Sequence, residues 1–162
     1  MHKPRLAILV SVCLLSAATC LWATTRKAGL WELTTTMTWQ QSPLPSGIIP
    51  PGGEPHTTLV CLTQQQLDQY GSVLPQVAGC QITNVVAKAN SVTADMVCSG
   101  KMTGKGTLES SWSDDSHATG TVHFLGSIQV GTDSKTIEWT NHSSSVFKSA
   151  DCGAVKPTPP AQ

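Results

Sequence analysis

The stretch CQITNVVAKANSVTADMVC, residues 80–98, begins and ends with a cysteine and decides much of the fold. Its middle, KANS, has the composition of a turn between two strands. A hairpin centred on Ala89 places the two cysteines opposite each other on the more apolar face. The pairs on that face are Cys80–Cys98, Ile82–Met96, Asn84–Ala94 and Val86–Val92. Because directly opposite strand residues have the separation that a disulfide requires, this register predicts a Cys80–Cys98 disulfide.

The first 23 residues have the three-part layout of a secretory signal peptide, with a basic head, an apolar run from Leu6 and small residues at its end. Cleavage is expected after Ala23, which makes residues 1–23 an N-terminal signal helix. An uncleaved anchor over Leu6–Ala23 is one alternative, at the short limit for a membrane span. Lipidation at Cys20 is another, but the leucine expected three residues earlier is absent.

Four cysteines lie outside the signal segment, and an even number in an exported chain predicts two disulfides. These residues are Cys61, Cys80, Cys98 and Cys152. With Cys80 bonded to Cys98, the second bridge joins Cys61 and Cys152. Pairing Cys61 with Cys80 and Cys98 with Cys152 remains open.

The processed chain is weakly acidic, because Lys3 and Arg5 leave with the signal segment and the formal charge becomes about −2. A weakly acidic chain without a basic stripe is a poor binder of nucleic acid. The remaining ~139 residues suffice for one domain with one core. We expect no nucleic-acid partner, and membrane contact only through an uncleaved signal segment.

Several further segments have strand patterns. Residues 29–39 alternate, with Trp31 and Trp39 on the same face. A hairpin centred on Asp115 places Trp112, Ser110, Leu108 and Gly106 opposite Ala118, Gly120, Val122 and Phe124. Shorter strands are expected at 57–62, 127–130 and 135–140. Thr63 and Gln66 have the spacing of a capping box, which predicts one short helix near residues 63–71.

Seven or so short strands joined mostly by tight turns predict a mainly β fold, a single antiparallel meander. Such a chain limits its exposed edges by curling into a barrel-like or strongly bent sheet. We expect one β domain over residues 24–153, with a Pro/Gly-rich loop at 42–56 and a disordered tail at 154–162.

No motif for catalysis, a cofactor or a metal stands out. The cysteines lack zinc-site spacing, and His117 and His123 lie six residues apart, roughly 20 Å along a strand. We therefore assign no catalytic, cofactor-binding or metal-binding residues and favour a non-enzymatic protein. Tryptophan is the most suggestive residue type, and Trp31, Trp39 and Trp112 are candidates to face a ligand. A core built from tryptophan is the favoured explanation for them.

The residues also resemble a known family. Gly29-Leu-Trp-Glu32, the cysteine pair Cys80 and Cys98, and the closing Asp151-Cys152-Gly153 are similar to a small bacterial periplasmic family, the domain of unknown function number thirty-six-seventeen. The resemblance extends from about Lys27 to Gly153. It implies export to the periplasm and supports the β fold with two disulfides, but it supplies no catalytic residues.

Three functions are compatible with these observations. The first is a non-catalytic β domain of the periplasm that binds a small apolar ligand or an envelope protein. The second is a hydrolase whose site is assembled from distant residues, with His117, His123 or His142 beside an acid and a serine. The third is an envelope assembly or stress factor that acts through surface contacts.

Overall fold

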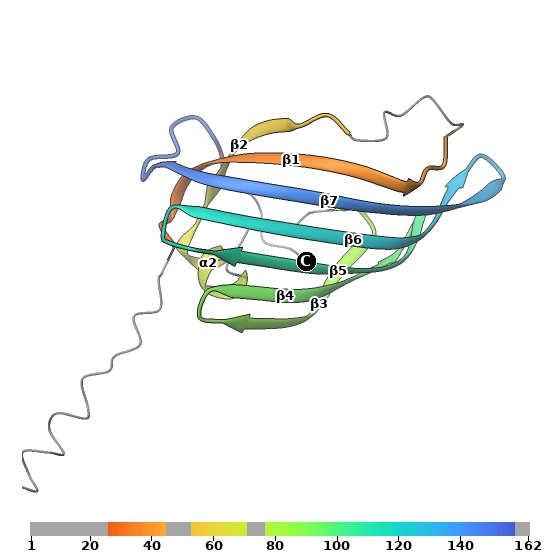
Figure 1. Ribbon diagram of the computed structural model, residues 1–162, viewed down its shortest axis with the longest axis horizontal. Coiled ribbons are helices and arrows are strands. Elements are labelled where there is room, and N and C mark those ends of the chain that lie inside the picture. Colours follow the sequence, from red (N-terminus) through yellow and green to blue (C-terminus); the bar gives the residue numbers. More distant parts are fainter. Residues whose placement is uncertain (1–25, 45–52, 71–76, 158–162) are drawn as a thin grey trace, which may run out of the picture.

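The computed structural model describes residues 26–44, 53–70 and 77–157, which form one antiparallel sheet of seven strands and one short helix (Figure 1). The strands are β1 (Gly29–Gln41), β2 (His56–Leu62), β3 (Cys80–Lys88), β4 (Ser91–Ser99), β5 (Met102–Trp112), β6 (His117–Val130) and β7 (Asp133–Ser149). The helix is α2 (Gln64–Tyr70). The expected signal segment, most of the 42–56 loop and the end of the tail lie outside the described residues.

The strand order is β2-β1-β7-β6-β5-β4-β3, and every neighbouring pair is antiparallel. Strands β3 to β7 form a meander, β7 then pairs with β1, and β2 and β3 are the two edges. The predicted mainly β meander is confirmed. The sheet is open, so a closed barrel is not formed.

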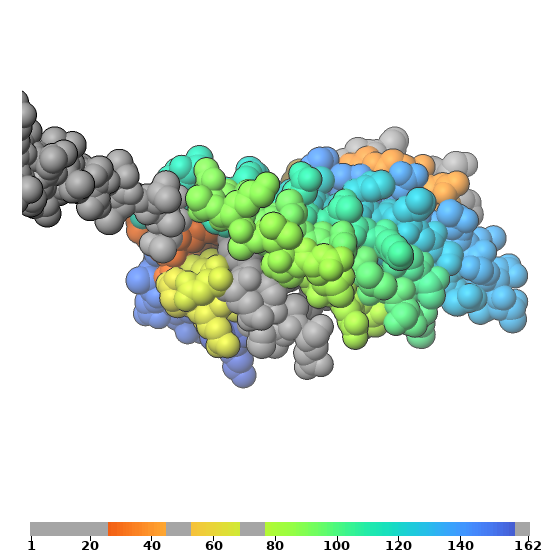
Figure 2. Space-filling view, turned by 90° about the horizontal axis from the view of Figure 1, so that it is seen from below, coloured from red at the N-terminus to blue at the C-terminus, as the bar shows by residue number. Residues whose placement is uncertain are grey.

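The two ends of the sheet differ (Figure 2). Helix α2, in yellow, lies at one end near the start of β1, whereas the β6–β7 hairpin, in light blue, projects at the opposite end. The chain leaves the sheet at edge strand β2 and enters it again at edge strand β3. Helix α2 belongs to this connection, and its Leu67 packs against Trp31 and Leu62.

The β5–β6 hairpin has the register predicted around Asp115. Trp112 lies opposite Ala118 and Leu108 opposite Val122. Buried and exposed side chains alternate along β5 from Gly106 to Trp112, as expected for a strand with one face on a core. One face of this long hairpin therefore belongs to the interior.

The β3–β4 hairpin follows the prediction at the cysteine end but not at the turn. Cys80 lies opposite Cys98, whereas Val86 lies opposite Thr93 rather than Val92. The two-residue turn at 89–90 requires a register one residue away from the cysteine register. A β-bulge between Thr83 and Val86 absorbs the difference. Val86 consequently faces outward and is 51% exposed.

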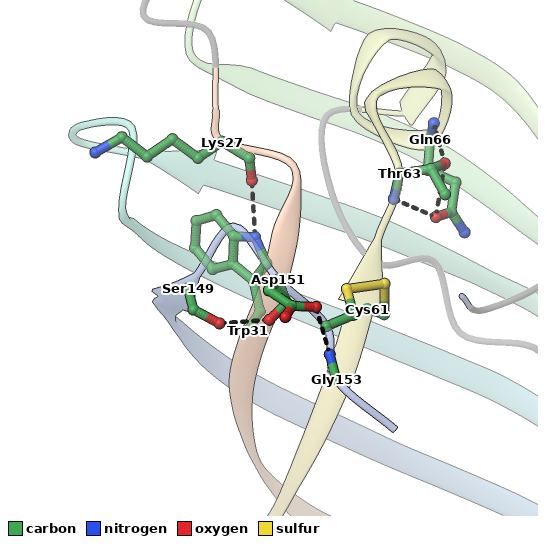
Figure 3. Close-up of a disulfide and its surroundings, with 9 residues drawn as sticks. Lys27, Trp31, Cys61, Thr63, Gln66, Ser149, Asp151 and Gly153 are labelled. Atoms are coloured by element: carbon green, nitrogen blue, oxygen red, sulfur yellow. Dashed lines mark hydrogen bonds between the residues drawn. A yellow bond between two sulfur atoms is a disulfide. The ribbon is translucent and has the colours of Figure 1, made fainter. Parts of the chain in front are cut away.

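The capping box that precedes α2 is confirmed (Figure 3). The Thr63 N–H donates to Gln66 Oε1 at 2.9 Å, and the Gln66 N–H donates to Thr63 Oγ1 at 3.3 Å. These reciprocal bonds satisfy N–H groups that have no partner within the helix. The helix therefore begins directly after β2.

Two disulfides are present, as predicted. One joins Cys80 and Cys98 within the β3–β4 hairpin, and the other joins Cys61 of β2 to Cys152 after β7 (Figure 3). After this disulfide in the sequence, Pro157 forms an isolated parallel β-bridge with Cys61. Two disulfides are typical of a protein that folds in an oxidising, exported environment.

Candidate functional site

The apolar interior of the bent sheet is divided into separate clusters. The largest contains Met96, Phe124, Ile137 and Trp139, together with Ala94, Cys98, Leu108 and Val122. A second cluster at the α2 end contains Trp31, Leu62 and Leu67, and a third contains Val92, Trp112 and Ala118. A continuous core would need large apolar side chains between the clusters.

Small and polar residues occupy that intervening region. Registers of the sheet align Thr35 of β1, Ser143 of β7, Gly120 of β6 and Ser110 of β5 in one row across four strands. A Cβ atom at Gly120 would lie 2.8 Å from Ser143 Oγ. The row has too little side-chain volume to fill the space above it.

A cavity of about 280 Å³ lies over this row. Its apolar lining includes Leu33, Leu108 and Val122, and its polar lining includes Thr35, Ser110, Asn141, Ser143 and Ser145. The volume is near the lower end of the range for small-molecule pockets, and the mixed lining is of the kind that holds an apolar body in a fixed orientation.

The serine hydroxyls of the cavity donate to the backbone of the sheet. Ser110 Oγ donates to the Thr119 carbonyl at 3.1 Å, and Ser143 Oγ donates to the Gly120 carbonyl at 3.3 Å. Ser145 Oγ is 3.5 Å from the Ala118 carbonyl. The hydroxyl lone pairs remain as hydrogen-bond acceptors.

Asn141 contributes a further acceptor. Its Oδ1 is buried and receives no hydrogen bond from the described part of the chain. Buried polar atoms are nearly always paired, so this unfilled acceptor on a residue that lines the cavity is an exception that requires a cause.

A buried guanidinium lies behind one end of the cavity. Arg26 is 4% exposed, lies 4.2 Å from the ring centroid of Trp31 and 5.9 Å from that of Trp112, and its Nη2 donates to Ser145 Oγ at 3.4 Å. Burial lowers the pKa of Arg26 to about 10, which leaves the side chain protonated at neutral pH. A fixed positive charge therefore stands beside Ser145.

The three tryptophans singled out from the sequence surround this region without lining the cavity. Trp31 is fully buried, and its Nε1 donates to the Lys27 carbonyl at 2.9 Å (Figure 3). Trp112 is buried and borders a separate hollow of about 400 Å³. Trp39 is partly buried against the largest cluster.

The histidines are not arranged as a catalytic relay. His117 Nδ1 lies 3.0 Å from Asp114 Oδ2 and 3.3 Å from Ser116 Oγ, so acid and serine reach the same ring nitrogen. A serine–histidine–acid relay needs them on opposite nitrogens. Hydrogen bonds, above all from the Ser116 N–H, lower the pKa of Asp114 well below its usual range. This cluster organises the β5–β6 turn.

His123 and His142 are exposed on the outer face of the sheet. His123 Nε2 is 3.0 Å from Glu138 Oε1, and His142 Nδ1 is 3.2 Å from Thr121 Oγ1. Within the described ranges, no three His, Cys, Asp or Glu side chains are grouped so as to hold a metal ion. Nor does that part of the chain contain a helix with the length and apolar character needed to cross a membrane.

The sequence did not predict the cavity, although it predicted that two of its lining residues are neighbours. The hairpin predicted around Asp115 already placed Ser110 opposite Gly120 on the apolar face. The contribution of β7 was not recognised, because its polar residues at 141–145 do not read as a core-facing strand. The burial of Arg26 beside the cavity was not predicted, because no sequence pattern indicates a buried guanidinium.

Comparison with known proteins gives one match. The family model described as "Protein of unknown function (DUF3617)" matches residues 26–152. No curated protein and no solved structure matches the chain. Because the family match covers most of the chain, the resemblance seen in the sequence is confirmed, and the protein belongs to this family of proteins of unknown function.

Proposed function

We propose that this protein is a non-catalytic β domain that binds a small, largely apolar molecule in the cavity on the inner face of its sheet. The observation that carries the proposal is the cavity of about 280 Å³, which interrupts the core over the Thr35–Ser143–Gly120–Ser110 row. Larger apolar residues in this row would bury more apolar surface and join the separate clusters into one core. A binding site explains why small residues stand there.

We place this activity in the periplasm. Residues 1–23 have the pattern of a cleaved signal peptide. The two disulfides agree with an oxidising compartment. A soluble carrier or sensor of an apolar compound fits that location, because such compounds need a protein to cross an aqueous space.

The first experiment is intact mass spectrometry of the protein purified from its native compartment. The mass is measured once under native conditions and once after denaturation without reduction. We expect an adduct that is present only in the native measurement. The denatured mass reports the cleavage site and any lipid, and two oxidised cysteine pairs make it about 4 Da lower than the fully reduced mass.

Filling the cavity gives a matched pair of variants. Ser143 lines the cavity, whereas Ser144 faces the outer surface. Ser143→Leu should abolish the adduct, because its side chain occupies the space of the ligand, and Ser144→Leu should retain it. An adduct that survives in Ser143→Leu would place binding elsewhere. A native mass without any adduct would direct attention to an envelope protein as the partner.

A further inference from the structure

We propose that the cavity selects a neutral molecule that joins an apolar body to a hydrogen-bond donor, such as an alcohol or an amide N–H. This inference rests on the proposed function and names the class of ligand. It follows from three properties of the lining: the direction of its hydrogen bonds, the charge behind it and the position of its apolar side chains.

The direction of the hydrogen bonds favours a donor. The protons of Ser110, Ser143 and Ser145 point to backbone carbonyls. Thr35 Oγ1 likewise donates to the His56 carbonyl at 3.4 Å. The hydroxyl oxygens keep lone pairs, and Asn141, a lining residue, adds an oxygen that accepts nothing from the described residues. This oxygen is shielded from solvent, so a ligand reaches it by a rotation of the Asn141 side chain. A ligand that donates finds partners without disturbing the wall, whereas a ligand that only accepts displaces an existing bond.

The charge behind the wall favours a neutral donor. A ligand cation would satisfy the same acceptors, but Arg26 stands in contact with Ser145 and is itself largely removed from water. Repulsion between like charges is strong where solvent screening is weak. The same charge would attract an anion, but an anion also needs hydrogen-bond donors, and the serine hydroxyls of the lining already donate to backbone carbonyls.

The apolar side chains of the lining determine the chemistry of the rest of the ligand. Leu33, Leu108 and Val122 come from three different strands and line the cavity beside its polar row. A ligand that is polar throughout would leave these side chains against polar atoms. The arrangement instead suits a molecule with one polar end and a compact hydrocarbon or aromatic body.

The test uses four probes that share one body and differ in the head group: cinnamyl alcohol, cinnamyl methyl ether, cinnamate and cinnamylammonium. Binding to the full processed protein, freed of any copurified ligand, is followed by amide chemical-shift titration. We expect the alcohol to bind about threefold to tenfold more tightly than the ether, the effect of one net hydrogen bond. The two ions should bind more weakly than the alcohol.

Replacement of Asn141 identifies the acceptor. Asn141→Leu keeps a side chain of similar size and should reduce the preference for alcohol over ether to within about twofold, while the ether still binds. His142→Leu, on the opposite face of the same strand, should keep the wild-type preference. Because Asn141→Leu removes a buried unpaired oxygen, folding should be preserved.

The outcomes separate the two proposals. Equal binding of alcohol and ether, or tighter binding of either ion, would overturn the ligand class while leaving the binding function in place. No shift of cavity residues with any probe, together with no native adduct, would overturn the binding function itself.

Discussion

The interior face of β7 shows how individual residues interrupt a core. It begins with Ile137 and Trp139, continues with Asn141, Ser143 and Ser145, and becomes apolar again at its end. Burying a hydroxyl without a partner costs free energy, and the two serines avoid that cost by donating to carbonyls of β6. Asn141 Oδ1, in contrast, is buried and receives no hydrogen bond from the described residues. Polar side chains are thus tolerated in the interior only because the neighbouring strand satisfies most of them.

Asp114 gives a prediction at the residue scale. Its carboxylate accepts the N–H groups of Ser116 and His117, each at 2.7 Å, and these bonds hold its pKa below the usual range. A carboxylate with a depressed folded-state pKa stabilises the protein above its unfolded pKa of about 4, and that stabilisation is lost as the pH falls below it. Asp114→Asn should therefore be less stable than the wild type at pH 7, with the difference shrinking on acidification between about pH 5 and 2.

The measurement for Asp114 is the midpoint of urea unfolding across that pH range. Asparagine can still accept the two N–H groups, so the variant isolates the charge from the shape of the turn. Parallel pH profiles for the two proteins would show that the carboxylate contributes nothing through its ionisation.

At the scale of elements, the β3–β4 hairpin combines two conflicting registers. The disulfide fixes Cys80 opposite Cys98, and the turn fixes Lys88 opposite Ser91. One extra residue must be accommodated between them, and Asn84 does so with a φ of 52°. Asparagine is one of the few residues other than glycine that adopts this left-handed conformation readily. The bulge also interrupts an edge strand, which limits pairing with other chains.

Substitution at Asn84 tests this account of the bulge. Asn84→Val should lower the free energy of unfolding by about 1–2 kcal/mol relative to Asn84→Gly, because a β-branched side chain is strained at positive φ. Both variants lose the bond from Asn84 Nδ2 to Asp95 Oδ2 equally, so their difference reports the backbone. Urea denaturation of the pair is the measurement, and equal stabilities would mean that the strand slips into a register without the bulge.

The same elements show what the sequence can and cannot predict. Where one pattern controls a hairpin, as around Asp115, alternation alone predicts the pairs from Gly106–Phe124 to Trp112–Ala118. Where a disulfide and a turn demand different registers, a single centre of symmetry cannot describe the hairpin, and the bulge is missed. The cavity was missed for a further reason. Its row runs across four strands, and alternation within one strand carries no information about which rows become adjacent in the sheet.

At the scale of the molecule, the connectivity makes β2 an edge strand that can separate from the sheet. Strand β2 pairs only with β1 within the sheet, whereas the meander from β3 to β7 is continuous. The Cys61–Cys152 disulfide joins β2 to the segment after β7, across a sequence separation of 91 residues. The Cys80–Cys98 disulfide closes a separation of only 18 residues within one hairpin. The first bridge therefore constrains the whole domain and the second constrains one hairpin.

Removal of each bridge should reflect this difference. In the chain-entropy model, a bridge stabilises by restricting the unfolded chain, by about 5 kcal/mol for the long loop and about 3 kcal/mol for the short one. The double variant Cys61→Ala/Cys152→Ala should thus lose more stability in urea denaturation than Cys80→Ala/Cys98→Ala. It should also release β2, which hydrogen exchange of the β2 amides that are bonded to β1 would detect as faster exchange than in the hairpin variant. An equal or larger loss in the hairpin variant would mean that the core contacts of Cys98, which is 4% exposed and packs in the largest cluster, outweigh the entropy of the longer loop.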